Sequence, residues 1–322
     1  MQYKIYGKNQ IAMKKILKKY IYENYHANAM VILAACVIMA QYHFGERALR
    51  MAAFSVLFTV MLETALCFMP YFRRSFSISS SLFTALSVSL LMPAAAPYWL
   101  PVCGIFPVYL FSAYLKAKKF KFLPPGGAVL PEGAAAVFLI TLFFNRLAFA
   151  YPVNKSRSLA YMLQSSMNAE LSEIRFADIY SGNLPGPMGA TCLAVLAGGL
   201  VYLIARVIRR PKTGTAAAPV SYILGAALTA LIFQRTNLGR QYSVLFELSS
   251  GMLLFAAVVF ISDRRLYPDS RPFRIGLAFG GGISAVLLRH IGFLEDWSCF
   301  TVILIAAVTF VLKIRMEKAN GK

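Results

Sequence analysis

Long apolar stretches alternate with short polar connections from residue 27 to residue 312. A helix needs about 20 residues to cross the hydrocarbon core of a bilayer, and several stretches are shorter, so tilted or half-length helices are expected. The pattern predicts an all-α polytopic membrane protein with about ten transmembrane helices. The ten stretches are Ala27–Tyr42, Met51–Met69, Ser80–Met92, Tyr98–Leu115, Gly133–Ala150, Gly189–Ile208, Val220–Phe233, Leu245–Ile261, Phe273–Leu288 and Trp297–Leu312.

Composition and charge agree with this pattern. Hydrophobic residues make up 58% of the chain and the mean hydropathy is +0.61, which excludes an ordinary soluble domain. When the connections are assigned to alternating sides, 24 of the 33 Lys and Arg fall on the side of the termini and eight on the other. Cytoplasmic loops carry the excess of positive charge, so both termini are predicted to be cytoplasmic. The net charge of +20 then reflects topology and contact with anionic membrane lipid, and we expect no nucleic-acid partner.

The chain divides into two groups of five stretches around one longer polar stretch. We expect a basic interfacial segment at 1–26, a first membrane repeat at 27–150, an external loop at 151–188, a second repeat at 189–312 and a tail at 313–322. Because five is odd, equivalent helices of the two groups run in opposite directions, which predicts an inverted five-plus-five repeat.

Polar residues inside apolar stretches are the first candidates for a site. Glu63 is predicted to lie in the bilayer, where an ionisable group costs on the order of 2.5 kcal/mol or more unless it is paired or hydrated. Glu63 and Asp263 are candidates for an ion path, although capping a neighbouring helix would also explain Glu63. Ser250 and Gly251 open a helix whose N–H groups could bind a cofactor, or they permit close helix packing. The scattered cysteines and histidines predict no metal site.

Four short motifs resemble one known family. The chain is similar to the family that contains the D subunit of the Rnf electron-transport complex and the B subunit of the sodium-pumping NADH:quinone oxidoreductase, and it is closest to the former. The motifs are Ser81–Leu86 with Pro93 and Pro97–Trp99, Tyr180–Thr191, Leu248–Leu253 with Ser262–Asp263, and Leu288–Gly292.

The resemblance implies a ten-helix inverted repeat in the bacterial cytoplasmic (inner) membrane. It also implies flavin cofactors, namely FMN joined by a phosphoester bond to a threonine of the external loop, and riboflavin. The partners it implies are iron–sulfur and flavoprotein subunits of an Rnf-type complex and a flavin transferase.

The FMN attachment signal of the family is altered in this chain. The Ala-Thr pair ends at Thr191, where Met188 replaces the expected hydroxyl residue and Pro185 the expected acid. Ser166 is the alternative attachment position, with Ala160 in place of the acid. Thr191 is also suited to the N-terminus of the following helix.

These observations favour a membrane subunit of a flavin-dependent translocase that moves Na⁺ or H⁺, rather than a self-sufficient enzyme. Two alternatives stay open. One is a divergent paralogue without covalent flavin that serves as a scaffold or ion-path subunit. The other is a stand-alone secondary transporter built on an inverted repeat.

Overall fold

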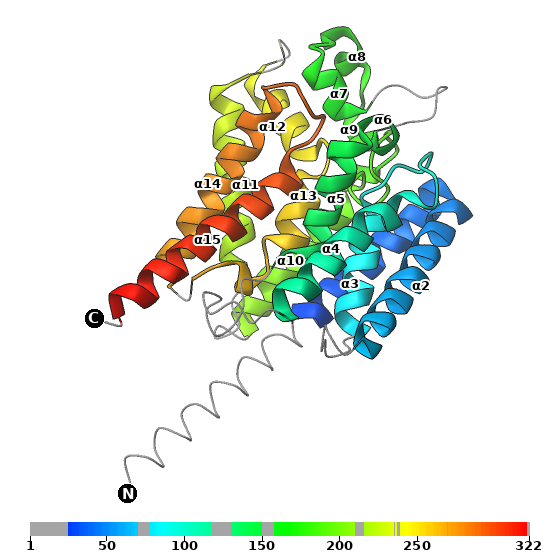
Figure 1. Ribbon diagram of the computed structural model, residues 1–322. Helices are drawn as coiled ribbons and strands as arrows, with labels where there is room; N and C mark the ends of the chain where they lie inside the picture. The colour runs from blue at the N-terminus through cyan, green and yellow to red at the C-terminus, as the bar shows by residue number, and fades with distance from the viewer. Residues whose placement is uncertain are drawn as a thin grey trace, which may run out of the picture.

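A computed structural model describes residues 25–69, 78–117, 130–149, 158–209, 216–234, 236, 239–268 and 270–320. Most of the predicted N-terminal segment 1–26 lies outside the described residues. Within them the regular structure is helical, apart from one isolated antiparallel bridge between Pro93 and Pro187 (Figure 1). The all-α prediction is therefore confirmed.

The first half is a bundle of apolar helices. Its members are Tyr25–Phe44, α2 (Glu46–Phe68), α3 (Ile78–Leu90), α4 (Leu100–Ala117), α5 (Glu132–Phe143) and the single turn α6 (Asn145–Ala148). Helix α2 contacts both α3 and α4, and α5 contacts the same two helices. The predicted continuous stretch Gly133–Ala150 is wrong in one respect: Phe144 leaves the helical region, at φ −122° and ψ 38°, and separates α5 from α6.

The second half contains one helix that is broken into two parts. Its elements are α10 (Leu193–Arg209), α11 (Ala217–Ile232), α12 (Arg240–Ser249), α13 (Leu253–Phe255), the π-helix η2 (Ala256–Phe260), the 3₁₀ turn η3 (Arg264–Leu266), α14 (Arg271–Arg289) and α15 (Ser298–Asn320). Helix α11 contacts α12 and α14, and α15 contacts α14 and η2. The two halves meet where α5 contacts α15.

Glycines allow α11 and α14 to approach backbone to backbone. A Cβ atom on Gly225 would lie 2.3 Å from the Phe279 carbonyl oxygen, and one on Gly282 would lie 2.0 Å from the Tyr222 carbonyl oxygen. Any side chain at these two positions would force the helices apart, in keeping with the use of small residues at membrane helix interfaces.

The helices identify a membrane protein with several apolar spans. Tyr25–Phe44, Glu46–Phe68 and Ser298–Arg315 are long and apolar enough to cross a bilayer, and the bent pair Tyr242–Ser249 and Leu253–Phe260 would provide a fourth span. Helices α3, α4, α5 and α11 are apolar but shorter. Each of the ten predicted stretches contains a helix, while the total of ten spans stays a prediction.

The described part of the stretch between the two halves, residues 158–188, contains short helices. It contains α7 (Leu159–Gln164), α8 (Asn168–Glu173) and α9 (Phe176–Ser181), which we call the cap. The cap has its own small apolar core, which includes Phe246 of α12. In Figure 1, α7 and α8 lie at the end of the bundle opposite the C-terminus of α15. The core residues of the cap itself are Leu159, Met162, Leu163, Leu171 and Ile179.

Candidate functional site

The break between α12 and α13 is the most distinctive feature of the second half. The two parts of this helix are bent by 67°. Ser249 and Ser250 hydroxyls donate to the carbonyls of Leu245 and Glu247, at 2.6 and 3.0 Å, so they compete with the regular helical hydrogen bonds. Helix α12 ends where Ser250 becomes extended, with φ −80° and ψ 145°, and Gly251 then takes a left-handed conformation, with φ 58°, at small conformational cost.

The Arg289 guanidinium, at the end of α14, donates hydrogen bonds to backbone carbonyls at the C-terminal end of α12. Its Nη1 donates to the Glu247 carbonyl at 2.9 Å and to the Ser250 hydroxyl at 2.9 Å. Its Nη2 donates to the Ser250 carbonyl at 3.1 Å. Carbonyls at a helix C-terminus lack intrahelical donors and carry partial negative charge, so a buried cation is well suited to this position.

The Asp296 carboxylate accepts a hydrogen bond from the backbone on the other side of the break, just before α13. Its Oδ2 accepts from the Met252 backbone N–H at 2.7 Å and from Arg289 Nη2 at 2.6 Å, and its Oδ1 accepts from the Ser298 backbone N–H at 2.6 Å. A Cβ on Gly251 would lie 1.9 Å from Asp296 Oδ2. Glycine is therefore required at the break both for its conformation and for its size.

One ion pair thus joins the two ends of a broken helix, and we call it the staple. A second carboxylate, Glu247 Oε2, lies 3.2 Å from Arg289 Nη1. The side chains of Arg289 and Asp296 are each 1% exposed and that of Glu247 is 0% exposed. Desolvation of buried charges is expensive, so their mutual attraction and the backbone hydrogen bonds are needed to hold them in place.

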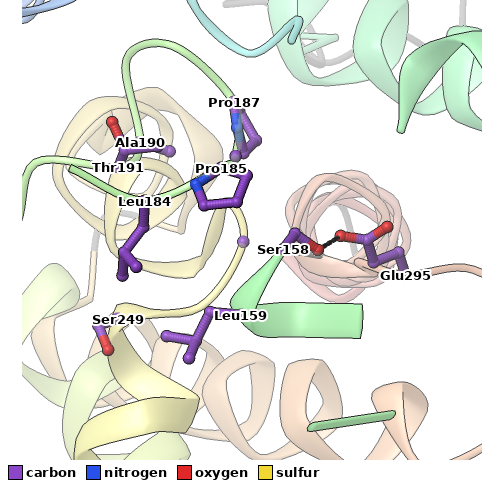
Figure 2. Close-up of a pocket in the computed structure, with 11 residues that line it drawn as sticks. Ser158, Leu159, Leu184, Pro185, Pro187, Ala190, Thr191, Ser249 and Glu295 are labelled. Atoms are coloured by element: carbon purple, nitrogen blue, oxygen red, sulfur yellow. Dashed lines mark hydrogen bonds between the residues drawn. The ribbon is translucent and has the colours of Figure 1, made fainter. Parts of the chain in front are cut away.

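A small pocket lies on one side of the break (Figure 2). Its volume of about 20 Å³ is enough for about one water molecule. Figure 2 shows the segment 184–191 on one side of the pocket and Ser158 with Glu295 on the other, joined by a hydrogen bond. The lining residues are Ser158, Leu159, Leu184, Pro185, Gly186, Pro187, Ala190, Thr191, Ser249, Gly251 and Glu295.

The two predicted attachment residues occupy different surroundings. The Thr191 hydroxyl lines this pocket, is buried, and has no hydrogen-bond partner in the described part of the chain. Ser166 lies outside the pocket, at the turn after α7, where it is exposed and left-handed with φ 52°. The structure therefore brings Thr191 and Gly251 together but leaves Ser166 apart from them.

The ion-path candidates lie away from the break. Glu63 is fully buried on α2. Asp263 caps η3 and forms a bidentate pair with Arg265, with distances of 2.9 Å to Nε and 2.7 Å to Nη2. Asp263 follows η2 and Gly251 precedes α13, so the two residues lie at opposite ends of the segment α13–η2.

The two residues that make the staple are not predicted by the sequence. Arg289 falls in an external connection of the predicted topology and enters only through the motif Leu288–Gly292, and Asp296 carries no prediction. The sequence does contain a signal: Glu247 lies within an apolar stretch, Arg289 and Asp296 adjoin two others, and such charges need partners in a bilayer. Sequence spacing alone does not show that residues near the ends of two helices meet at one break.

Fold and site together define a helical membrane protein with a broken helix held by an internal ion pair. A model of the NQR2, RnfD, RnfE family matches residues 18–321, and the chain belongs to this family. The family assignment made from the four sequence motifs is confirmed.

Named relatives are distant but match along most of the chain. The D subunit of the ion-translocating oxidoreductase complex of Actinobacillus pleuropneumoniae serotype 5b is 25% identical over 318 residues, covering 85% of this chain and 87% of the relative. The D subunit of the Na⁺-translocating ferredoxin:NAD⁺ oxidoreductase complex of Acetobacterium woodii is 23% identical over 304 residues, covering 91% and 89%. The B subunit of the Na⁺-translocating NADH-quinone reductase of Chromohalobacter salexigens is 26% identical over 242 residues, covering 67% and 53%.

Proposed function

We propose that this chain is the D-type membrane subunit of an Rnf-type complex that couples flavin-mediated electron transfer to movement of Na⁺ or H⁺. The observation that carries the proposal is the family match over residues 18–321, with relatives of the D type aligned over most of both chains. Iron–sulfur and flavoprotein subunits of the same complex would be its partners, and the cap would face the external one.

The order of helix contacts supports an inverted repeat of residues 27–150 and 189–312. In the first half, α2 contacts α3 and α4, and α5 contacts α3 and α4. In the second half, α11 contacts α12 and α14, and α15 contacts η2 and α14. The second, third, fourth and fifth members of each group therefore pair in the same pattern, as two halves related by a pseudo-twofold axis would.

Contacts between connections support the proposed sidedness. On the side assigned to the exterior, the His43 ring contacts the Ser181 carbonyl at 2.7 Å, and Arg47 donates to the Ala95 carbonyl at 3.2 Å. On the side assigned to the cytoplasm, the Arg265 guanidinium lies 5.2 Å from the centre of the Tyr25 ring. The contacting connections are those that the charge distribution assigns to one side, which supports cytoplasmic termini and an external stretch 151–188.

The hydroxyls differ in how well they suit covalent FMN. A phosphoester bond requires access to the hydroxyl, and the isoalloxazine ring requires space beside it. Thr191 faces a pocket large enough for about one water, so its surroundings do not fit the group. Ser166 is exposed on a turn of the cap and fits it sterically. When bound, FMN would supply one- and two-electron chemistry, and the part of the cap would be to hold it outside the membrane.

Ser250 and Gly251 are better suited to holding the break than to binding FMN or riboflavin. The Ser250 hydroxyl and carbonyl both accept from Arg289, and Asp296 occupies the space next to Gly251. We therefore propose that these two residues position the two parts of the broken helix.

Covalent attachment can be tested on the full-length protein produced together with a flavin transferase. We expect a fluorescent band after denaturing electrophoresis, retained in Thr191→Ala and lost in Ser166→Ala, with FMN mass on the peptide containing Ser166. Retention of fluorescence in Ser166→Ala with loss in Thr191→Ala would reverse the assignment. A band without fluorescence for the unaltered protein would show that the chain carries no covalent FMN.

The second candidate function is a scaffold or ion-path role in a chain that has lost covalent flavin. The buried Thr191 hydroxyl and the altered residues before it favour this alternative. A complex that translocates ions while this chain holds no covalent flavin would establish it.

An ion path through Glu63 can be examined in the assembled complex. Because Glu63 is fully buried on a helix long enough to span the bilayer, we propose that its charge contributes to ion movement. We expect Glu63→Gln to reduce ion uptake into proteoliposomes without reducing flavin content. Unimpaired uptake would remove Glu63 from the path.

A further inference from the structure

The connection between α14 and α15 touches two separate parts of the molecule through neighbouring side chains. We call this connection, Ile291–Trp297, the strap. Asp296 points to the break and accepts from the Met252 N–H and from Arg289. The neighbouring Glu295 accepts a hydrogen bond from the Ser158 hydroxyl at the start of the cap (Figure 2).

The hydrogen bond between Glu295 and Ser158 lies at the N-terminus of the first helix of the cap. Ser158 is buried, and its hydroxyl oxygen also accepts from the Tyr161 N–H at 3.1 Å, so it caps the N-terminus of α7. One serine hydroxyl therefore donates to the strap and starts the first helix of the cap. The next residue of the cap, Leu159, belongs to its apolar core.

The cap is joined to the break from a second direction. Phe246 of α12 is part of the apolar core of the cap, and α12 contacts α7. Helix α12 ends at the break, so a shift of the cap would also move α12. The strap carries Asp296, which holds the start of α13 through the Met252 N–H. The pocket lies between these two attachments and is lined by Ser158, Ser249, Gly251 and Glu295.

We propose that Glu295 is a positioning residue that couples the external cap to the broken membrane helix through the adjacent Asp296. Loosening of the cap is transmitted to the hydrogen bond between Asp296 and the Met252 N–H, and loosening of the break is transmitted to the cap. This coupling does not depend on whether the cap carries FMN. It gives any ligand or partner protein that binds outside a physical route to residues 250–252 within the membrane element.

The test is hydrogen–deuterium exchange of the full-length protein in lipid nanodiscs, followed in peptides from 159–181 and 246–260. Glu295→Ala removes the acceptor of the Ser158 hydroxyl, whereas Glu295→Gln retains an oxygen acceptor. We expect Glu295→Ala to speed exchange about tenfold in the cap and severalfold at 251–254, and Glu295→Gln to restore both. The matched control is Glu46→Ala, which removes the exposed acid of the pair with Arg50 and is expected to change neither peptide.

Coupling must also be reciprocal. Gly251→Ala, which crowds Asp296 directly, is expected to speed exchange in 159–181. Faster exchange in the cap of Glu295→Ala with unchanged exchange at 251–254 would overturn the proposal, as would an unchanged cap in Gly251→Ala. If Glu295→Ala does not fold, Ser158→Ala removes the same contact from the other side. Because it also removes the N-cap of α7, its exchange at 251–254 is the decisive readout, and unchanged exchange there would overturn the proposal.

Discussion

Helix α3 and the broken segment α12–α13–η2 hold the third place in their respective halves, yet only one of them is interrupted. The serines at 79–81 lie in the first turn of α3, which continues as regular helix to Leu90. The similar sequence Ser249–Gly251 ends α12 and opens a 67° bend. In α3 the Ser87 and Ser89 hydroxyls donate to carbonyls of their own helix, those of Thr84 at 3.0 Å and Leu86 at 3.1 Å.

The difference comes from one glycine and from charges supplied by distant residues. Gly251 adopts φ 58°, a conformation that a serine at the place of Ser81 would adopt only with strain. The freed carbonyls and N–H groups in the second half are then satisfied by Arg289 and Asp296. Similar local sequences thus give different structures because a break inside a membrane is tolerated only where other groups satisfy the backbone.

Removal of the staple cation should have the largest effect. In Arg289→Met the carboxylates of Asp296 and Glu247 would stay buried beside the break after loss of their guanidinium, which costs about 3 to 5 kcal/mol of stability. We expect a large fall in the midpoint of thermal unfolding in detergent, followed by the combined fluorescence of the two tryptophans, Trp99 and Trp297.

The matched control for Arg289→Met is Arg50→Ala on α2. Arg50 pairs with Glu46, and their side chains are 69% and 75% exposed, so the loss should stay below about 1 kcal/mol. Equal midpoints for Arg289→Met and the unaltered protein would mean that the staple does not hold the break.

The second largest effect is expected from Gly251→Ala. The new Cβ would lie 1.9 Å from Asp296 Oδ2, and the left-handed backbone adds strain, so we expect a loss of at least about 2 kcal/mol. Gly276→Ala on α14 is the control, because its Cβ would meet no atom within 4 Å and alanine favours a helix by about 0.5 to 1 kcal/mol. Unfolding midpoints of the two variants should therefore move in opposite directions, and a neutral Gly251→Ala would contradict the role assigned to this glycine.

Most of the fold could be predicted from the pattern of apolar residues. Long runs of apolar residues can be recognised from local composition, and all ten predicted stretches contain helices. The interruption at Phe144 could not be predicted, since that residue is as apolar as its neighbours. The short helices of the cap could not be predicted either, because α7 and α9 are stabilised by a core that includes Phe246 from another part of the chain.

The site was predictable only in part. Ser250, Gly251 and Thr191 were selected from sequence and lie at or beside the break. Arg289 ends α14 and Asp296 lies in the strap, and nothing in their spacing predicts that Asp296 contacts Met252, 44 residues before it. Long-range hydrogen bonds of this kind depend on how the helices pack, which a single sequence does not encode in any local pattern.

The smallest loss of stability is expected from Ser87→Ala, because the Ser87 hydroxyl donates to a carbonyl of its own helix. Ser250→Ala is the variant with which it is compared. The Ser250 hydroxyl accepts from Arg289 at 2.9 Å and donates to the Glu247 carbonyl, so Ser250→Ala should cost about 1 to 3 kcal/mol. The Ser87 hydroxyl donates to the Thr84 carbonyl of α3, a backbone group that the helix can satisfy by itself, so Ser87→Ala should cost less than about 1 kcal/mol. Thermal unfolding of the two variants in the same detergent measures the difference, with the Ser87→Ala midpoint expected close to that of the unaltered protein. Equal losses would show that hydroxyls stabilise both helices in the same way, and the contrast between α3 and the stapled break would then rest on Gly251 and the ion pair alone.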